Sequence, residues 1–307
     1  MFTLKNYEYM TIYHHTFRHR LFILSLSALL TLGFSTVSQS CHAQSIALHT
    51  APLTQLQGIH PWWGAHVAYF GDSITDPRNS GSKKKYWAYL QDLLHITPYV
   101  YGVSGREWSD IPRQLKQLKA EQGNDFDAIV ILMGTNDYNH GVRIGQWYTE
   151  ADTMVYAAVG KPKQLVKRRY RRFCYDPNTF RGRINIAMKM LRDSFSDKQI
   201  VLLTPLHRAL FDPNDKNVQP DERIQNSCGE YVDAYVQSVK EAGQVWAVPV
   251  IDLAAESGLF PLINGTTYYH HAHDLLHPND AGHLRMAKTL VYQLMTLPLN
   301  FATPAAE

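Results

Sequence analysis

Short apolar runs rich in β-branched residues recur along this 307-residue chain, and segments with helical periodicity separate them. The runs lie at residues 66–70, 98–103, 126–133, 199–204 and 248–253. Between them, apolar residues spaced three and four apart predict helices at 87–94, 111–119, 184–195, within 222–242, and at 284–294. Strands that alternate with helices in this way form a parallel sheet covered on both faces. With 45% apolar residues the chain can bury one such core, so we expect a single α/β domain over residues 44–307.

The first 43 residues have a different character. Arg18, His19 and Arg20 precede an apolar run at 21–34, and small and polar residues then lead to Ala43. This order predicts a signal peptide over residues 1–43 and export to the periplasm, the cell surface or the medium. The run is shorter than the ~20 residues that cross a bilayer, so we expect no stable membrane span. Lipoprotein anchoring through Cys41 is the less favoured alternative.

The connection at residues 138–181 is far longer than the usual ~4–6 residues and predicts an insertion. Insertions at the active edge of such a sheet often build the substrate site. Nine basic residues and one acidic residue lie between 161 and 183. A solvated helix face is the preferred interpretation, while attraction to an acidic polysaccharide or a membrane surface stays open. Without a known nucleic-acid motif, no nucleic-acid partner is expected.

Four short polar blocks follow the predicted strands or precede the last helix. They are GDSIT at 71–75, GVSG at 102–105, GTND at 134–137 and DLLH at 274–277. Together they supply a hydroxyl, a backbone N–H at a glycine, a side-chain amide and an Asp/His pair. Those are the groups that acyl transfer through a serine nucleophile requires.

With these four blocks in this order, the chain resembles the SGNH (GDSL-type) hydrolase family over roughly residues 67–294. The resemblance implies a three-layer α/β/α, flavodoxin-like fold whose five or so parallel strands have the order 2-1-3-4-5. It also implies a serine ester hydrolase that needs no cofactor. Ser73 would be the nucleophile, His277 its base, and Asp274 the group that orients the imidazole.

The resemblance further implies three donors to the oxyanion: the backbone N–H groups of Ser73 and Gly105 and the side-chain amide of Asn136. Gly102 stays open as the alternative to Gly105. Many members of the family carry an asparagine where this chain has Val100. That difference changes how the loop is braced but removes no group that touches substrate.

Further candidates lie near the predicted active edge. His207 follows the fourth strand, and Trp108, Trp147, Tyr148, Tyr268 and Tyr269 offer flat faces on which sugar rings could pack. The cluster His270, His271, His273 and Asp274 has metal-ligand types. Because adjacent histidines in an extended segment point to opposite sides, no metal is expected there. Cys174 and Cys228 could pair in an oxidising compartment, and the sequence leaves this open.

These features predict an exported esterase that removes O-acetyl groups from carbohydrate. A lipase or lysophospholipase acting on longer acyl esters is the alternative within the enzyme class. A glycan-binding relative that has lost activity would show damage to at least one block, and none is damaged. A metal-dependent phosphodiesterase that uses the histidine cluster is the remaining alternative. The expected substrates are small-molecule or glycan esters.

Overall fold

The computed structural model describes residues 59–264, 268–299 and 301. Its centre is a parallel sheet of five strands: β1 (His66–Gly71), β2 (Thr97–Val100), β3 (Ala128–Leu132), β6 (Gln199–Leu203) and β7 (Val250–Ile251). The strands lie in the order β2-β1-β3-β6-β7, which is 2-1-3-4-5 when only these strands are counted. The predicted order is therefore confirmed. The signal peptide predicted for residues 1–43 lies outside the described residues.

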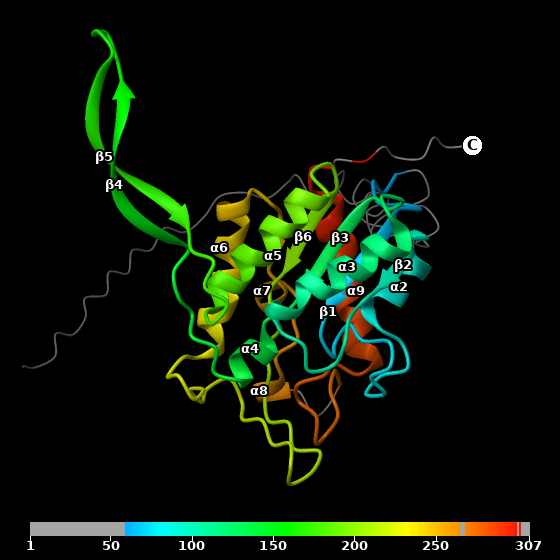
Figure 1. The fold of residues 1–307 in the computed structure, drawn as a ribbon. Helices are drawn as coiled ribbons and strands as arrows, with labels where there is room; N and C mark the ends of the chain where they lie inside the picture. The colour runs from blue at the N-terminus through cyan, green and yellow to red at the C-terminus, as the bar shows by residue number, and fades with distance from the viewer. Residues whose placement is uncertain (1–58, 265–267, 300, 302–307) are drawn as a thin grey trace, which may run out of the picture. The chain divides into compact units, whose positions relative to one another are not determined.

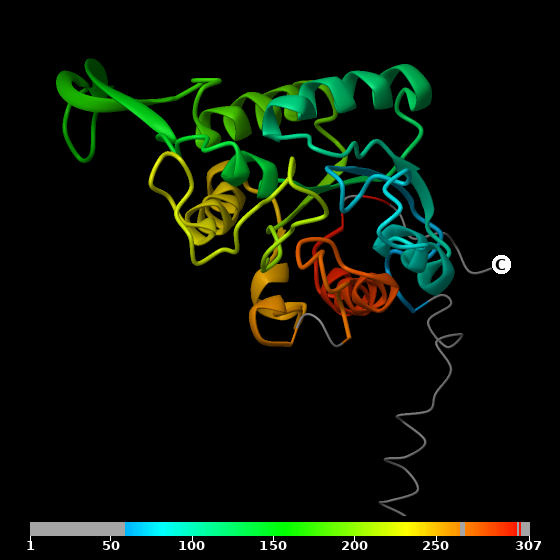
Figure 2. The ribbon, with the colours of Figure 1, turned by 90° about the horizontal axis from the view of Figure 1, so that it is seen from below.

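Helices cover both faces of this sheet (Figure 1). On one face lie α3 (Ile111–Gln122), α5 (Phe180–Ser194) and α6 (Val232–Trp246), and on the other lie α2 (Tyr86–Leu94) and α9 (Asp280–Met295). Figure 2 shows these layers edge-on. The short helices are α4 (Thr135–Asn139), α7 (Leu253–Glu256), α8 (Pro261–Asn264) and the 3-10 turn Trp108–Asp110. The predicted three-layer α/β/α fold is confirmed.

The side chains of each central strand belong to two separate hydrophobic cores, one on each face of the sheet, because successive side chains of a strand point to opposite sides. In β1, Ala68 and Phe70 pack with α3 and α5, whereas Val67 and Tyr69 pack with α2 and α9. Strand β3 is fully buried along its length. This explains why its sequence is a continuous apolar run rather than an alternating one.

The last helix, predicted at 284–294, begins earlier, at Asp280, and is capped by an asparagine side chain. Pro278 is a favourable first helical residue, but the helix starts at Asp280 and its N-cap is Asn279. The Asn279 side chain accepts a hydrogen bond from Gly282 N at 3.0 Å and donates to the Tyr268 carbonyl at 2.8 Å. Pro278 lies between His277 and this N-cap, outside the helix. No helix in the described part of the chain is both long and apolar enough to cross a membrane.

Residues 164–173 of the basic segment form a β-strand, so the interpretation of the segment as a helix face was wrong there, and only Arg181 and Arg183 lie in a helix. Strands β4 (Tyr148–Ala157) and β5 (Gln164–Phe173) pair in an antiparallel hairpin that is separate from the central sheet. At its base, Phe173 stacks on Trp246 with a ring separation of 4.5 Å. Trp246 ends α6 just before β7 begins, so the base lies toward the N-terminal edge of the sheet. Figure 1 shows the hairpin standing away from α5 and α6.

Candidate functional site

Ser73, His277 and Asp274 form a continuous hydrogen-bonded chain at the C-terminal edge of the sheet. Ser73 Oγ lies 2.8 Å from His277 Nε2, and His277 Nδ1 lies 2.8 Å and 3.0 Å from the two Asp274 oxygens. An ionised carboxylate only accepts hydrogen bonds, so Nδ1 carries the imidazole proton. Nε2 is then free to accept the proton of the Ser73 hydroxyl. This is the geometry of a nucleophile and its base.

Ser73 is held by the tight turn that follows β1. Asp72 accepts a hydrogen bond from Ile74 N at 3.0 Å, and the Thr75 and Asp76 N–H groups donate to the Asp72 carbonyl. Burial raises the pKa of Asp72 to about 6, against the opposing effect of the Ile74 N–H. Asp72 therefore braces the turn from beneath and does not contact the surface.

Gly71 is required for close packing and not for its backbone conformation. Its φ is not in the left-handed region, so the turn does not depend on glycine for its backbone conformation. A Cβ at Gly71 would lie 2.3 Å from Thr75 Oγ1 and 2.9 Å from the Leu132 carbonyl oxygen. The glycine is needed because two segments approach it closely. Gln114 of α3 clamps it further, since its side-chain amide bonds both Gly71 N and Gly71 O at 3.0 Å.

The Asp/His segment is held in place by the loop after β6. Ala209 N donates to the Leu275 carbonyl at 2.9 Å, and Leu275 N donates to the Leu210 carbonyl at 3.1 Å. Phe211 from the same loop packs edge-on against the His277 ring at 5.2 Å. Sequence reasoning missed Phe211, because a lone aromatic residue in a polar loop carries no local signal.

Asp274 is ionised across the working range of an esterase. Burial alone would raise its pKa, but hydrogen bonds from the His277 ring, His277 N and Leu276 N outweigh burial and lower it. An ionised carboxylate holds the imidazole in one tautomer and stabilises the imidazolium.

Hydrogen bonds join the 102–105 loop to the turn that carries Ser73. Val103 N donates to the Gly71 carbonyl at 3.1 Å, and Asp76 accepts from both Ser104 N and Ser104 Oγ, at 2.8 Å and 3.0 Å. Burial tends to raise the pKa of Asp76, but the bonds from Arg78 and Ser104 lower it to about 2. Asp76 thus braces the loop that carries Ser104.

The two glycines of the loop differ in a way that separates their roles. A Cβ at Gly102 would lie 2.7 Å from Thr75 Cβ and 3.0 Å from Asp76 N, so this glycine serves close packing. Gly105 has φ +77° and open space where a Cβ would lie. Among the described residues, neither Gly105 N nor Ser73 N donates to an acceptor. Gly105 is therefore the better candidate for an oxyanion donor.

Asn136 lies in the first turn of α4, directly after β3. One of its two amide protons is used, because Nδ2 donates to the Arg106 carbonyl at 2.9 Å. That bond fixes the orientation of the amide and leaves its second proton for a ligand. Asp137 next to it is buried, accepts from Trp108 N at 3.1 Å, and pairs with Arg183 at 2.9 Å. Asp137 is therefore a brace and not a solvated residue.

Trp108 and Trp147 do not offer faces to a sugar ring, so that expectation was wrong. Trp108 is fully buried and its indole donates to the Met133 carbonyl at 3.3 Å. Trp147 is also buried, and its indole donates to Glu241 of α6 at 2.8 Å. Both were mistaken for surface residues because they lie in segments that connect regular elements.

His207 lies on the C-terminal side of β6, but its ring is committed to neighbours. Its Nδ1 lies 2.8 Å from Glu222, which raises the pKa of His207, and its ring packs edge-on against Phe260. His207 remains a candidate for substrate contact. In the described part of the chain, no three His, Cys, Asp or Glu side chains are grouped as metal ligands would be. Cys174 and Cys228 are both free.

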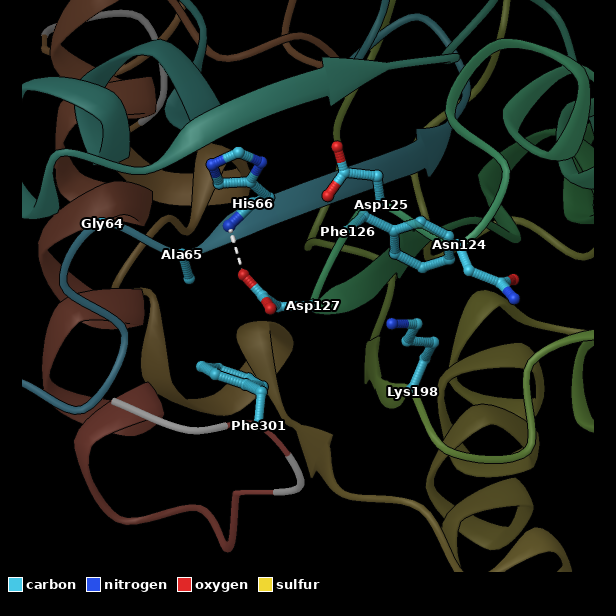
Figure 3. Close-up of a pocket in the computed structure, with 9 residues that line it drawn as sticks. All are labelled: Gly64, Ala65, His66, Asn124, Asp125, Phe126, Asp127, Lys198 and Phe301. Atoms are coloured by element: carbon cyan, nitrogen blue, oxygen red, sulfur yellow. Dashed lines mark hydrogen bonds between the residues drawn. The ribbon is translucent and has the colours of Figure 1, made fainter. Parts of the chain in front are cut away.

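A hollow at the opposite edge of the sheet is not this site (Figure 3). It is lined by residues at or just before the N-terminal ends of β1, β3 and β6, among them His66, Asp127 and Lys198. His66 N donates to Asp127 at 2.7 Å there. The hollow contains no hydroxyl, imidazole and carboxylate in series, so it lacks the groups of the Ser73 site.

The blocks and the fold agree with what comparisons with known proteins find. The model of the GDSL-like lipase/acylhydrolase family matches residues 69–285. A protein from Lactobacillus plantarum superposes with a TM-score of 0.58 and 20% identity, covering 76% of this chain and 98% of its own. A possible lipase from Chitinophaga pinensis gives 0.56 and 18%, covering 75% and 97%. These two likenesses concern the fold. The comparison with curated proteins finds no match.

The match extends from the end of β1 into the last helix and therefore includes all four blocks. It covers well over half of the chain, and the predicted family is confirmed. The chain belongs to the GDSL-like lipase/acylhydrolase family and is a serine ester hydrolase.

Proposed function

We propose that the protein is an exported esterase that removes O-acetyl groups from carbohydrate through a Ser73–His277–Asp274 triad. The observation that carries the mechanism is the unbroken chain from Ser73 Oγ to the Asp274 carboxylate, with steps of 2.8 Å. A serine hydroxyl is a weak nucleophile until a base removes its proton. His277 is the base in reach.

In this mechanism Ser73 Oγ attacks the ester carbonyl carbon as its proton passes to His277 Nε2. The carbonyl oxygen becomes an oxyanion, which the N–H groups of Ser73 and Gly105 and the free amide proton of Asn136 would stabilise. When the C–O bond breaks, His277 gives the proton to the departing sugar oxygen, which leaves as a hydroxyl group, and an acyl-Ser73 ester remains. Water, activated by the same imidazole, then releases acetate.

The surroundings of the donors support a polar substrate with a short acyl group. Ser104, Gly105 and Arg106 are exposed beside the donors, and Arg78 is exposed on the neighbouring turn. Ser73, Asn136 and His277 are each only 7% exposed, so little of their surface is open to a substrate, which suits a small acyl group. A long acyl chain would require an apolar channel beside Ser73.

The test is a hydrolysis series in which one sugar carries acetyl, butyryl or octanoyl groups, with Ser73→Ala as the control. We expect the highest kcat/KM for acetyl and a loss of several orders of magnitude in Ser73→Ala at unchanged stability. Faster cleavage of the octanoyl sugar would instead identify a lipase-type esterase. Near wild-type activity of Ser73→Ala would refute the triad itself.

A further inference from the structure

The far end of the β4–β5 hairpin carries a group of exposed apolar side chains. We define the hairpin tip as residues 154–166. Its Val159 is 94% exposed and its Tyr156 is 63% exposed, and Met154, Val155 and Leu165 are exposed beside them. None of these side chains covers the core of the domain. Exposed apolar residues gathered in one place mark a surface that meets a partner.

The apolar side chains of the tip point to both faces of the hairpin. Residues paired across two strands share a face, and successive residues alternate. Tyr156 pairs with Leu165 on one face, while Val155 pairs with Val166 on the other. A protein partner that docked on one side would leave the other face in water. An apolar medium around the whole tip would cover both.

The stem, which we define as residues 149–153 and 167–172, carries cations on both faces, but only one face neutralises them. On that face Glu150 pairs with Arg169 and Arg171, and Asp152 pairs with Lys167. The opposite face has Arg168 across from Thr153 and Arg172 across from Thr149.

No carboxylate among the described residues forms an ion pair with Arg168 or Arg172. Arg172 instead lies over the ring of Tyr170, with 5.5 Å between the guanidinium carbon and the ring centre. Lys163 at the tip lies over Tyr156 at 4.2 Å. These cations are available to an anionic partner.

We propose that the hairpin docks the protein on an anionic membrane surface, with the apolar side chains of the tip in the interface and Lys161, Lys163, Arg168 and Arg172 at the headgroups. Exposed apolar side chains lie beside tyrosines and cations along the hairpin, as in segments that bind at a membrane interface, and Lys161 and Lys163 in the turn keep its end at the headgroups. An acidic polysaccharide would need the cations but would leave the apolar tip in water. The proposal does not depend on the substrate of the esterase.

The hairpin is held firmly enough at its base to act as an arm. Phe173 lies between Tyr148 and Trp246, at ring separations of 5.3 Å and 4.5 Å. Asn185 of α5 donates to the carbonyls of Trp147 and Cys174, both at 2.9 Å, and so joins the two ends of the hairpin. An isolated two-stranded hairpin is marginal in water, and these contacts compensate for that.

The experiment places a reporter at the tip of the full chain. Val159→Trp should shift its emission to shorter wavelength with phosphatidylcholine vesicles that contain about 30% phosphatidylglycerol, and brominated lipid should quench the added emission. The unsubstituted chain supplies the background spectrum. Pure phosphatidylcholine should give a much smaller shift, and high salt should weaken binding to the anionic vesicles.

Variants separate the two parts of the proposal in a vesicle flotation assay. Each cation near an anionic surface strengthens binding roughly fivefold, so Arg168→Gln with Arg172→Gln should weaken it roughly 25-fold. Val155→Ser, Val159→Ser and Leu165→Ser together should weaken it at least about tenfold. Residues 1–58 are the same in every variant, so any contribution of that segment to vesicle binding is constant. Differences in binding between the variants therefore come from the hairpin. Circular dichroism should show an unchanged fold.

Matched controls carry the same chemical changes elsewhere on the surface. Lys116→Gln with Lys119→Gln on α3 removes two exposed cations, and Val218→Ser, Ile224→Ser and Tyr292→Ser remove three exposed apolar side chains. Both should bind vesicles like the unsubstituted chain. Equal losses in the controls would overturn the proposal.

Three further results would also overturn the proposal. One is an unchanged emission of Val159→Trp on anionic vesicles. Another is binding to a soluble acidic polysaccharide that needs the stem but not the tip. The last is self-association in solution that the triple tip variant abolishes, because it would identify a second copy as the partner.

Discussion

The most informative single change at the proposed oxyanion site is at Asn136, whose amide is oriented by the Arg106 carbonyl. Asn136→Ala should lower kcat roughly 10²–10³-fold with little change in KM, because the amide acts on charge that develops in the transition state. Steady-state kinetics on a small acetyl ester would measure both constants. A higher KM at unchanged kcat would mean that Asn136 binds the ground state instead.

Asp76 gives a prediction about pH. Its pKa falls from the usual 3.8 to about 2 on folding, so the ionised carboxylate stabilises the protein above about pH 4. This stabilisation is lost as the pH falls from about 4 to 2. Asp76→Asn should therefore reduce the free energy of unfolding by roughly 1–2 kcal/mol at pH 7. The exposed Arg78 contributes little to this stabilisation, because water screens its charge.

Urea unfolding of both proteins between pH 7 and pH 3 would measure this effect. The difference between wild type and Asp76→Asn should shrink as the pH approaches 3. Asp215→Asn, at an exposed carboxylate, is the control and should differ little from wild type throughout. A constant difference across the range would show that Asp76 acts through packing and not through its charge.

At the level of single residues, the sequence identified the residues of the proposed triad better than the residues that hold them in place. Ser73, His277 and Asp274 lie in compact motifs, and the structure brings them within hydrogen-bond distance. Gln114 and Phe211 contact the same site from segments with no motif. Their roles arise from long-range packing, which a local pattern does not encode. Trp108 and Trp147 show the converse, since burial depends on the fold around them.

At the level of elements, the strands of the sheet were predicted because apolar periodicity directly reflects burial. Strand β3, predicted at 126–133, forms at Ala128–Leu132. The β4–β5 hairpin was missed because apolar periodicity marks only strands that are buried on at least one face. It is exposed on both faces, so no apolar alternation marks it. Its cations suit a solvated helix and a solvated strand equally well, and only the cross-strand pairing distinguishes them.

The hairpin also gives a prediction at this level. Its contacts with the domain are concentrated at its base, so residues 150–171 should be dispensable for folding. Thr149 and Arg172 face each other across the strands and can be joined by Asn-Gly, which favours a two-residue turn. The shortened chain should hydrolyse a small neutral ester within about twofold of wild type and unfold within a few degrees of it.

Phe173→Ala is the contrasting variant. It removes the ring that stacks on Trp246 at the base, and it should lower the free energy of unfolding by about 1–2 kcal/mol. A severe loss of activity in the shortened chain, with its fold intact, would show that the hairpin reaches the Ser73 site. Thermal unfolding and ester hydrolysis distinguish these outcomes.

At the level of the whole molecule, the two edges of the sheet carry different chemistry. The C-terminal ends of β1 and β3 lead into Ser73 and Asn136, as is usual for open α/β sheets. The hairpin base lies toward the other edge, beside the end of α6. Substitutions in the hairpin should therefore change membrane binding without changing ester hydrolysis. Substitutions at the Ser73 site should do the reverse, so each set of variants is a control for the other.

The proposed export applies to the whole chain and gives the last prediction. We propose that a basic segment, the apolar run at 21–34 and Cys-His-Ala at 41–43 together direct secretion and cleavage after Ala43. The protein produced in a bacterium with its own leader should appear in the periplasm with Gln44 as its first residue. Leu26→Arg interrupts the apolar run and should keep the uncleaved chain in the cytoplasm, whereas Leu26→Ile should not. N-terminal sequencing of each fraction measures the outcome, and a lipid-modified Cys41 at the N-terminus would show that the protein is anchored as a lipoprotein instead.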